Sequence, residues 1–281
     1  MAQIFFHDGK WMDEQPRLTG PMDHAFWMAS MVFDGARAYG GLAPDLKPHC
    51  ERLIRSANAL LLPPTKTAEE VEALCVEAIR KLPKEGEYYV RPMFFAREGF
   101  VSPDPDSIEF VLSVYDAPLP EPTGIKVGLS SFRRPARDMA PTDSKASCLY
   151  PNSQRALAEA ASKGFDNALI CDPSGNVAEL ATANVWMVKD GVAMTPVWNG
   201  TFLNGVTRQR VAALLADDGV EVLETTLTPD DFRNADEIFT TGNFAKVAPI
   251  IQFEDRELQP GPISGRARQL YFDWSEQSRI F

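Results

Sequence analysis

The stretch Asp116-Ala117-Pro118-Leu119-Pro120-Glu121-Pro122-Thr123-Gly124 divides the chain into two parts. Three of its residues are prolines within five positions. Because proline lacks a backbone donor and favours extended chain, neither a helix nor a central strand is expected to continue through it. We therefore predict a small N-terminal domain at residues 1–117, an interdomain linker at 118–124 and a larger C-terminal domain at 125–281. A length of 281 residues suits two domains of unequal size.

The part before the linker carries both helix and strand patterns. Apolar residues recur at helical spacing from about His49 to Leu61. A second helix is expected after Thr67-Ala68-Glu69-Glu70, a capping box in which a hydroxyl and a carboxylate satisfy the free amides of a helix start. Strand-like runs cover residues 88–95 and 108–115. This mixture predicts an α+β domain.

The part after the linker is richer in short strands. Helices are expected at about 152–163, at about 207–217 and after Ser264. The strand-like runs are 125–130, 168–171, 176–178, 186–188, 192–194, 220–226 and 237–241. We predict a mainly-β domain with packed helices here, and an α/β (α+β) class for the whole two-domain chain.

The composition argues against several classes of function. The chain has 28 basic and 39 acidic residues, a net charge of −11 without a basic cluster, so we expect no nucleic-acid or membrane partner. No apolar run approaches the roughly 20 residues of a membrane helix, and the first residues lack a secretion signal, so we expect a cytoplasmic protein. The four cysteines form no CxxC pair and the three histidines are isolated, which argues against a metal site.

Two short turns have the chemistry of anion sites. Gly205-Val206-Thr207-Arg208 opens a predicted helix, where free amides and the helix dipole favour a phosphate. Thr240-Thr241-Gly242-Asn243 follows a predicted strand and adds hydroxyl groups. Taken singly, each is more often an ordinary cap or loop. The glycine-rich strings of dinucleotide-binding folds and of nucleoside triphosphatases are absent.

Lys145 lies among small and hydroxyl residues in Pro141-Thr142-Asp143-Ser144-Lys145-Ala146-Ser147-Cys148-Leu149-Tyr150-Pro151-Asn152. On spacing alone, the more common interpretation is a solvated loop lysine. The alternative is a lysine that forms a Schiff base with a carbonyl, which needs a partly desolvated amine near other positive charge.

Taken together, these segments resemble the class IV (fold type IV) aminotransferases, which use pyridoxal phosphate, and are similar above all to the branched-chain members. Order and spacing carry the resemblance more than any single match does. The matching segments are Val32-Phe33-Asp34-Gly35-Ala36-Arg37, His49-Cys50-Glu51-Arg52-Leu53 with Ser56-Ala57, Tyr89-Val90-Arg91-Pro92, 145–150, Gly164-Phe165-Asp166-Asn167-Ala168, 177–184, Thr195-Pro196, 205–208, 235–239 and Thr241-Gly242.

The resemblance implies a role for each cofactor-binding residue. Lys145 would form the Schiff base with the cofactor aldehyde and then move the substrate Cα proton. Glu179, 34 residues further on, would pair with the pyridine nitrogen and keep it protonated. The remaining contacts would be Tyr150 to the 3′-oxygen, and Arg52, Val206, Thr207, Gly242 and Asn243 to the phosphate.

The resemblance also implies a substrate pocket, with two departures from the branched-chain pattern. Tyr89 and Arg91 match the residues that orient the substrate carboxylate, and Phe33 would line an apolar wall beside them. Met28 stands where those enzymes carry a tyrosine, and Asn243 stands where they usually place a threonine against the phosphate. Arg97 is a second candidate partner for a carboxylate.

The implied reaction is a two-stage amino transfer, with pyridoxal 5′-phosphate between the two domains of a homodimer or larger homo-oligomer. A branched-chain L-amino acid would be the donor and a 2-oxo acid such as 2-oxoglutarate the acceptor. Three alternatives remain open at this point: an R-selective amine or D-amino-acid transaminase, an aminodeoxychorismate lyase, and a non-enzymatic oxo-acid-binding protein.

Overall fold

The computed structural model describes residues 2–281, which divide into two compact units. The first unit runs to Leu119 and also includes Ser144–Leu149 and Ser275–Phe281; the second consists of Pro120–Asp143 and Tyr150–Trp274. The chain passes from one unit to the other inside the proline-rich stretch. Two segments that the sequence placed within 125–281 thus pack with the first unit. They join it through backbone hydrogen bonds such as Ala43 N to Ser278 O, 2.9 Å, which local patterns do not reveal.

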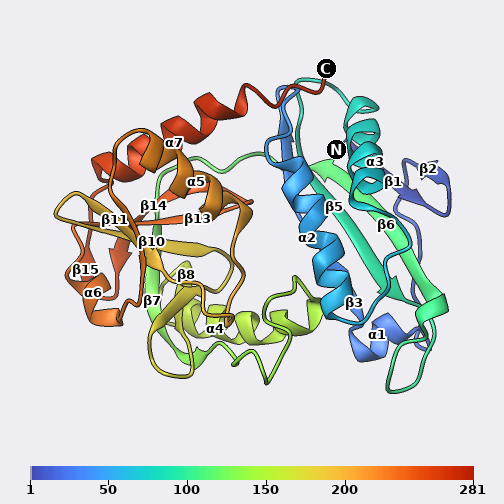
Figure 1. Ribbon diagram of the computed structural model, residues 1–281, viewed down its shortest axis with the longest axis horizontal. Coiled ribbons are helices and arrows are strands. Elements are labelled where there is room, and N and C mark those ends of the chain that lie inside the picture. The colour runs from blue at the N-terminus through green and yellow to red at the C-terminus, as the bar shows by residue number, and fades with distance from the viewer. Residues whose placement is uncertain (1) are drawn as a thin grey trace. The chain divides into compact units, whose positions relative to one another are not determined.

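The first unit is a six-stranded sheet covered by two helices. Five strands follow the order β2-β1-β6-β5-β3, and the sixth, β4, also pairs with β5. Every one of these strand pairs is antiparallel. Helices α2 and α3 pack on each other and on the sheet, as Figure 1 shows. The strands are β1 (Gln3–His7), β2 (Lys10–Met12), β3 (Met31–Phe33), β4 (Ala36–Tyr39), β5 (Glu87–Ala96) and β6 (Ile108–Asp116), and the helices are α1 (His24–Met28), α2 (Leu46–Ala59) and α3 (Ala68–Arg80).

The capping box predicted at Thr67 is confirmed. The Glu70 amide donates to the Thr67 hydroxyl over 3.2 Å, and the Thr67 amide donates to the Glu70 carboxylate over 2.7 Å. Helix α2 begins at Leu46, three residues before the predicted start at His49, with Asp45 as its N-cap in the left-handed region. Lys47 and Pro48 interrupt the apolar pattern there, so periodicity alone placed the start too late.

The second unit is built on a nine-stranded mixed sheet of order β12-β11-β10-β13-β14-β7-β8-β9, with β15 paired to β14. The strands are β7 (Ile125–Arg133), β8 (Asn167–Cys171), β9 (Val177–Leu180), β10 (Asn184–Lys189), β11 (Val192–Pro196), β12 (Val222–Thr225), β13 (Glu237–Gly242), β14 (Lys246–Phe253) and β15 (Arg256–Glu257). The helices are α4 (Tyr150–Ser162), α5 (Val206–Asp217), α6 (Pro229–Arg233) and α7 (Pro262–Ser275).

Successive side chains along a strand of this sheet belong to different apolar clusters. On β10, Val185 and Met187 belong to one apolar cluster, whereas Trp186 and Val188 belong to another that includes residues of α5 and α7. This alternation is the two-residue period of a strand buried on both faces. Strands β9 and β10 also contact each other although they are far apart in the strand order, so the sheet curls. The curl brings residues from distant strands to one end of the unit.

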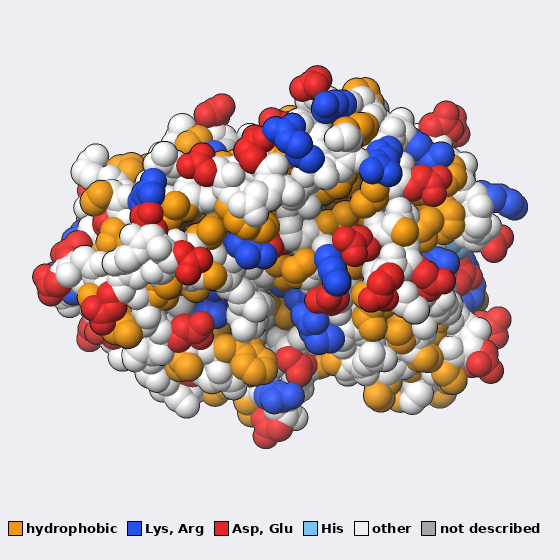
Figure 2. All heavy atoms as spheres, turned by 45° about the horizontal axis from the view of Figure 1, so that its top comes forward, with side chains coloured by type: hydrophobic (Ala, Val, Ile, Leu, Met, Phe, Trp, Pro, Cys, Tyr) orange, Lys and Arg blue, Asp and Glu red, His pale blue; other side chains and the backbone are white. Residues whose placement is uncertain are grey.

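The described surface carries charges of both signs. Figure 2 shows acidic and basic side chains interspersed on the face in view, with apolar side chains between them. Within residues 2–281, helices that combine the length and the apolar character needed to cross a bilayer are not found.

We expect the Thr67→Ala substitution to lower the free energy of unfolding by about 1 kcal/mol, because it leaves the first-turn amides of α3 without their hydroxyl acceptor. Urea denaturation followed by circular dichroism measures this change. Thr65→Ala, an exposed threonine of the same loop, is the matched control and should change stability by less than about 0.5 kcal/mol. Equal losses in the two variants would contradict a capping role.

Candidate active site

Lys145 lies in the first unit, just before a 3₁₀ turn at Ser147–Leu149. Its amide donates to the Ser56 hydroxyl over 2.9 Å, and its carbonyl accepts from the Phe33 amide over 3.0 Å. The ammonium nitrogen is 4.9 Å from the centre of the Phe33 ring. These contacts fix the backbone of Lys145, which is half-buried. Its amine lies over the ring of Phe33, one of the predicted substrate residues.

Arg52 is held by a buried carboxylate in the same unit. Its Nε and Nη2 donate to the two oxygens of Asp34 over 2.7 and 2.8 Å, and His49 Nδ1 lies 2.7 Å from Asp34 Oδ1. Burial alone raises the pKa of Asp34, but Arg52 and His49 outweigh it and hold that pKa well below its ordinary value. The ionised Asp34 therefore sets the orientation of the Arg52 guanidinium. The sequence pointed to Arg52 but not to Asp34 as its partner.

Tyr89 and Arg91, which alternate with buried residues along β5, form a cluster with Tyr115 of β6. Tyr89 faces Tyr115 in the strand register, and their rings stack with centres 5.8 Å apart. The Arg91 guanidinium carbon lies 5.1 Å from both ring centres, and its Nη2 donates to the Tyr115 hydroxyl. Partial burial raises the pKa of Tyr115, which keeps the hydroxyl protonated. Sequence reasoning missed Tyr115, which lies at a strand end beside the linker.

Arg91 has a buried donor that could bind a ligand. Its Nε is buried and has no hydrogen-bond partner among the described residues. Buried donors are rarely left unpaired, so this atom suits a carboxylate oxygen. Gly35 adjoins the cluster: a Cβ there would lie 2.1 Å from the Tyr89 hydroxyl, so only glycine admits the tyrosine in this position.

The other predicted substrate residues are placed as follows. Phe33 ends β3 and is half-buried beside the Lys145 amine. Met28 ends α1 and is 39% exposed.

Arg97 is engaged within the chain. Its Nε and Nη2 donate to Glu109 over 2.6 and 2.7 Å, and further bonds reach Asp23 and the Leu18 carbonyl. This bidentate contact lowers the pKa of Glu109 and raises that of Arg97. The contacts indicate that Arg97 anchors a loop.

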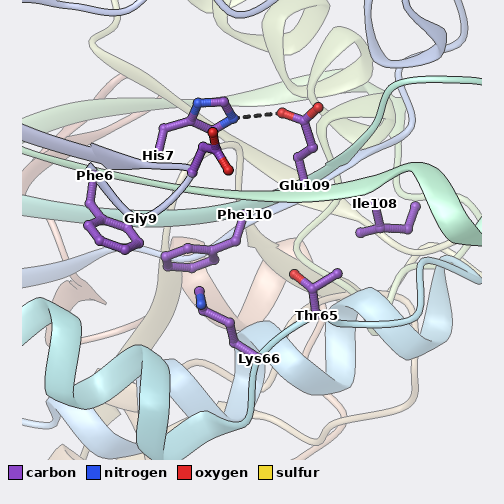
Figure 3. A pocket seen from close by; sticks show the side chains of 9 residues that line it. Phe6, His7, Gly9, Thr65, Lys66, Ile108, Glu109 and Phe110 are labelled. Atoms are coloured by element: carbon purple, nitrogen blue, oxygen red, sulfur yellow. Dashed lines mark hydrogen bonds and ion pairs between the residues drawn. The ribbon is translucent and has the colours of Figure 1, made fainter. Parts of the chain in front are cut away.

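The Glu109 carboxylate also borders a hollow of about 540 Å³ in the first unit. His7 Nε2 lies 2.6 Å from Glu109 Oε2. Figure 3 shows this pair beside the hollow, with Lys66 near the Phe6 and Phe110 rings. None of the predicted site residues lines it.

In the second unit, Glu179 on β9 is buried and flanked by two polar side chains. Arg134 Nε lies 3.4 Å from Glu179 Oε1, and Asn184 Nδ2 donates to Oε2 over 3.4 Å. Arg134 also donates to the Thr201 carbonyl and Asn184 to the Leu203 carbonyl, which holds both flanking groups in place. The carboxylate is thereby oriented from two sides. The sequence did not single out Arg134, which follows the end of β7.

The start of α5 lies next to Asn184. Gly205 is the N-cap, and it adds no side-chain cap to the amides of the first helical turn, which carries the predicted residues Val206 and Thr207. A Cβ at Gly205 would lie 1.9 Å from Asn184 Oδ1, so the lack of a side chain permits the approach. The free amides and the dipole of this helix start favour an anion.

The second predicted turn reaches the same end of the sheet. Asn184 of β10 faces Thr241 of β13 in the strand register, and Gly242 follows at the end of β13. A Cβ at Gly242 would lie 3.0 Å from that of Ala183. A buried carboxylate, a helix start and a glycine turn therefore gather at one place in the second unit.

Tyr150 is the first residue of α4 in the second unit and is 36% exposed, five positions after Lys145 in the chain. Over residues 2–281, no group of three or more histidine, cysteine, aspartate or glutamate side chains is arranged to hold a metal ion.

We expect the acid sensitivity of the protein to depend on Asp34. Because its pKa is lowered in the folded state, its ionisation stabilises the fold above the unfolded pKa of about 3.9, and this contribution is lost as the pH falls below that value. Between pH 6 and pH 3, the thermal midpoint of the unsubstituted protein should therefore fall more steeply than that of Asp34→Asn. Parallel pH profiles would contradict this assignment.

Comparison with known proteins places these features in a family. The family model described as "Amino-transferase class IV" matches residues 31–253. The branched-chain-amino-acid aminotransferase of Pseudomonas aeruginosa is 32% identical over 96% of this chain and 92% of its own length.

Solved structures agree with this match. A crystal structure of an aminotransferase from Brucella abortus bound to the cofactor PLP has a TM-score of 0.96 and 48% identity, covering 98% of this chain and 100% of that one. The Escherichia coli branched-chain amino acid aminotransferase gives a TM-score of 0.91 at 28% identity, covering 97% and 94%. The family and fold class predicted from the sequence are confirmed: this chain belongs to the class IV aminotransferase family.

Proposed function

We propose that the protein is a pyridoxal-phosphate-dependent transaminase that moves an amino group from a branched-chain L-amino acid to a 2-oxo acid such as 2-oxoglutarate. The observation that carries this proposal is the gathering of Glu179, the start of α5 and the Gly242 turn at one end of the second unit. The names of the relatives favour branched-chain substrates.

The residues present fit this cofactor. When bound, pyridoxal phosphate supplies an aldehyde that condenses with amines and a ring that withdraws electrons from the substrate carbon. The second unit offers a buried carboxylate suited to a protonated ring nitrogen and an uncapped helix start suited to a phosphate. Arg52, fixed by Asp34, adds a donor of rigid geometry.

Each residue of the proposed site then has a defined role. Lys145 binds the cofactor through its amine and moves the proton at the substrate Cα. Glu179 holds a proton on the ring nitrogen, and Arg134 and Asn184 orient its two oxygens. Tyr150 donates to the 3′-oxygen, which is attached to the ring next to the aldehyde group. The phosphate is held by Arg52, Val206, Thr207, Gly242 and Asn243.

The substrate is oriented from the first unit. Arg91 binds the substrate carboxylate through its buried Nε, while the stacked rings of Tyr89 and Tyr115 lie beside the guanidinium and support it. Phe33 and Met28 supply apolar surface for an aliphatic side chain. Arg97 has no part in this proposal, because Glu109 already occupies its guanidinium.

We further propose a cytoplasmic enzyme that works as a homodimer or a larger homo-oligomer. Of its partners, the amino acid and the oxo acid follow from the aminotransferase family itself. Sedimentation velocity of the purified protein measures the assembly state directly.

A donor panel tests the function. With 2-oxoglutarate as acceptor, we expect L-leucine to react faster than D-alanine and R-1-phenylethylamine, because Arg91 orients a carboxylate beside an apolar wall. Coupled detection of glutamate gives the rates. Faster turnover of D-alanine or of the R-amine would contradict the assignment of a branched-chain L-amino acid as donor. Release of pyruvate from aminodeoxychorismate without an acceptor would indicate a lyase.

Replacing Lys145 with alanine should abolish turnover, because no other group is proposed to move the Cα proton. Turnover is followed with L-leucine, and cofactor attachment by mass spectrometry after borohydride reduction. The control is Lys126→Ala, an exposed lysine of β7, which should retain both activity and attachment. Attachment at another lysine would overturn the assignment.

A further inference from the structure

A second lysine, Lys246, lies fully buried at the start of β14 in the second unit. It follows the three-residue loop after Gly242, with which it pairs across the hairpin. Its φ of 60° is in the left-handed region, where glycine is the unstrained choice. Because a lysine at such a position carries a backbone cost, its side chain is expected to have a use there.

The Lys246 amine contacts the side chain of Asn243. Its Nζ donates to Asn243 Oδ1 over 2.8 Å and lies 5.5 Å from the centre of the Tyr271 ring in α7. A lysine ammonium can only donate hydrogen bonds, so the amide oxygen of Asn243 must face it. The opposite end of the amide is therefore fixed as a donor.

That donor lacks an acceptor within the chain. Asn243 Nδ2 is buried and has no hydrogen-bond partner among residues 2–281. Buried amide groups are almost always satisfied, so an acceptor from outside the chain is indicated. The turn adjoins Gly242, at the end of the sheet where the amides at the start of α5 favour an anion.

We propose that Lys246 is a positioning residue that orients Asn243 so that its Nδ2 donates to a phosphate oxygen of the bound cofactor. This inference rests on the proposed function, since it takes the phosphate to be that of pyridoxal phosphate. Lys246 itself does not touch the phosphate. It selects one of the two orientations of an amide that would otherwise be free to flip.

The test compares two ligands of the apoprotein, pyridoxal 5′-phosphate and pyridoxal, which differ only in the phosphate. Dissociation constants are measured by quenching of tryptophan fluorescence. Asn243→Asp replaces the donor with an acceptor and should weaken binding of pyridoxal phosphate at least about tenfold, with little change for pyridoxal. Asn234→Asp, at an exposed asparagine of the same unit, should leave both constants unchanged.

A double-substitution cycle separates positioning from a purely structural role. Lys246→Met removes the donor and should weaken binding of pyridoxal phosphate several-fold, but it should have no further effect in an Asn243→Ala background. Lys246→Arg, which can still donate, should retain part of the affinity. Lys189→Met, a half-exposed lysine of the same unit, is the matched control.

Equal weakening of both ligands, or additive losses in the double variant, would overturn the proposal. If Lys246→Met does not fold, the comparison of Asn243→Asp with Asn234→Asp and the Lys246→Arg variant still decide it. An unsubstituted apoprotein that binds neither ligand would refute the proposed function instead. Tight binding of pyridoxal phosphate that is unaffected at Asn243 would refute this inference and the phosphate contact of Asn243, but not the proposed transaminase function.

Discussion

The buried carboxylate of Asp34 is the constraint on which the first unit depends. A charge without solvent must be paired, and here Arg52 and His49 of helix α2 supply the partners. The pairing ties that helix to the segment between β3 and β4. It also fixes the orientation of the Arg52 guanidinium, which we propose to bind the cofactor phosphate.

In the second unit, close backbone approach rather than charge pairing brings the proposed site residues together. Its sheet curls until β9 approaches β10, and two glycines then allow neighbouring segments to meet without a Cβ between them. Gly205 admits Asn184, and Gly242 admits the turn at Ala183. Because the approach depends on missing side chains, the shape of the proposed anion-binding end is set by the fold and needs few charged residues.

Local patterns in the sequence predicted much of the fold and less of the site. The capping box at Thr67 and the strands β5 and β6 involve neighbours in the chain, so periodicity and motif chemistry were sufficient. Tyr115, Arg134 and Asp34 act through residues distant in sequence or across strands, as in the Arg52–Asp34 pair with its separation of 18. Such contacts depend on register and curl, which no local pattern encodes.

One of the points at which the chain passes between the units lies between Leu149 and Tyr150, inside the motif that contains Lys145. The Lys145 amine and the proposed substrate wall thus share one compact unit, while the proposed ring and phosphate contacts other than Arg52 share the other. In the proposed site, changes at Met28 or Tyr115 would accordingly alter the preferred amino donor without changing the proposed anion-binding turns. Such a separation allows donor preference to diverge during evolution while the cofactor stays anchored in the same way.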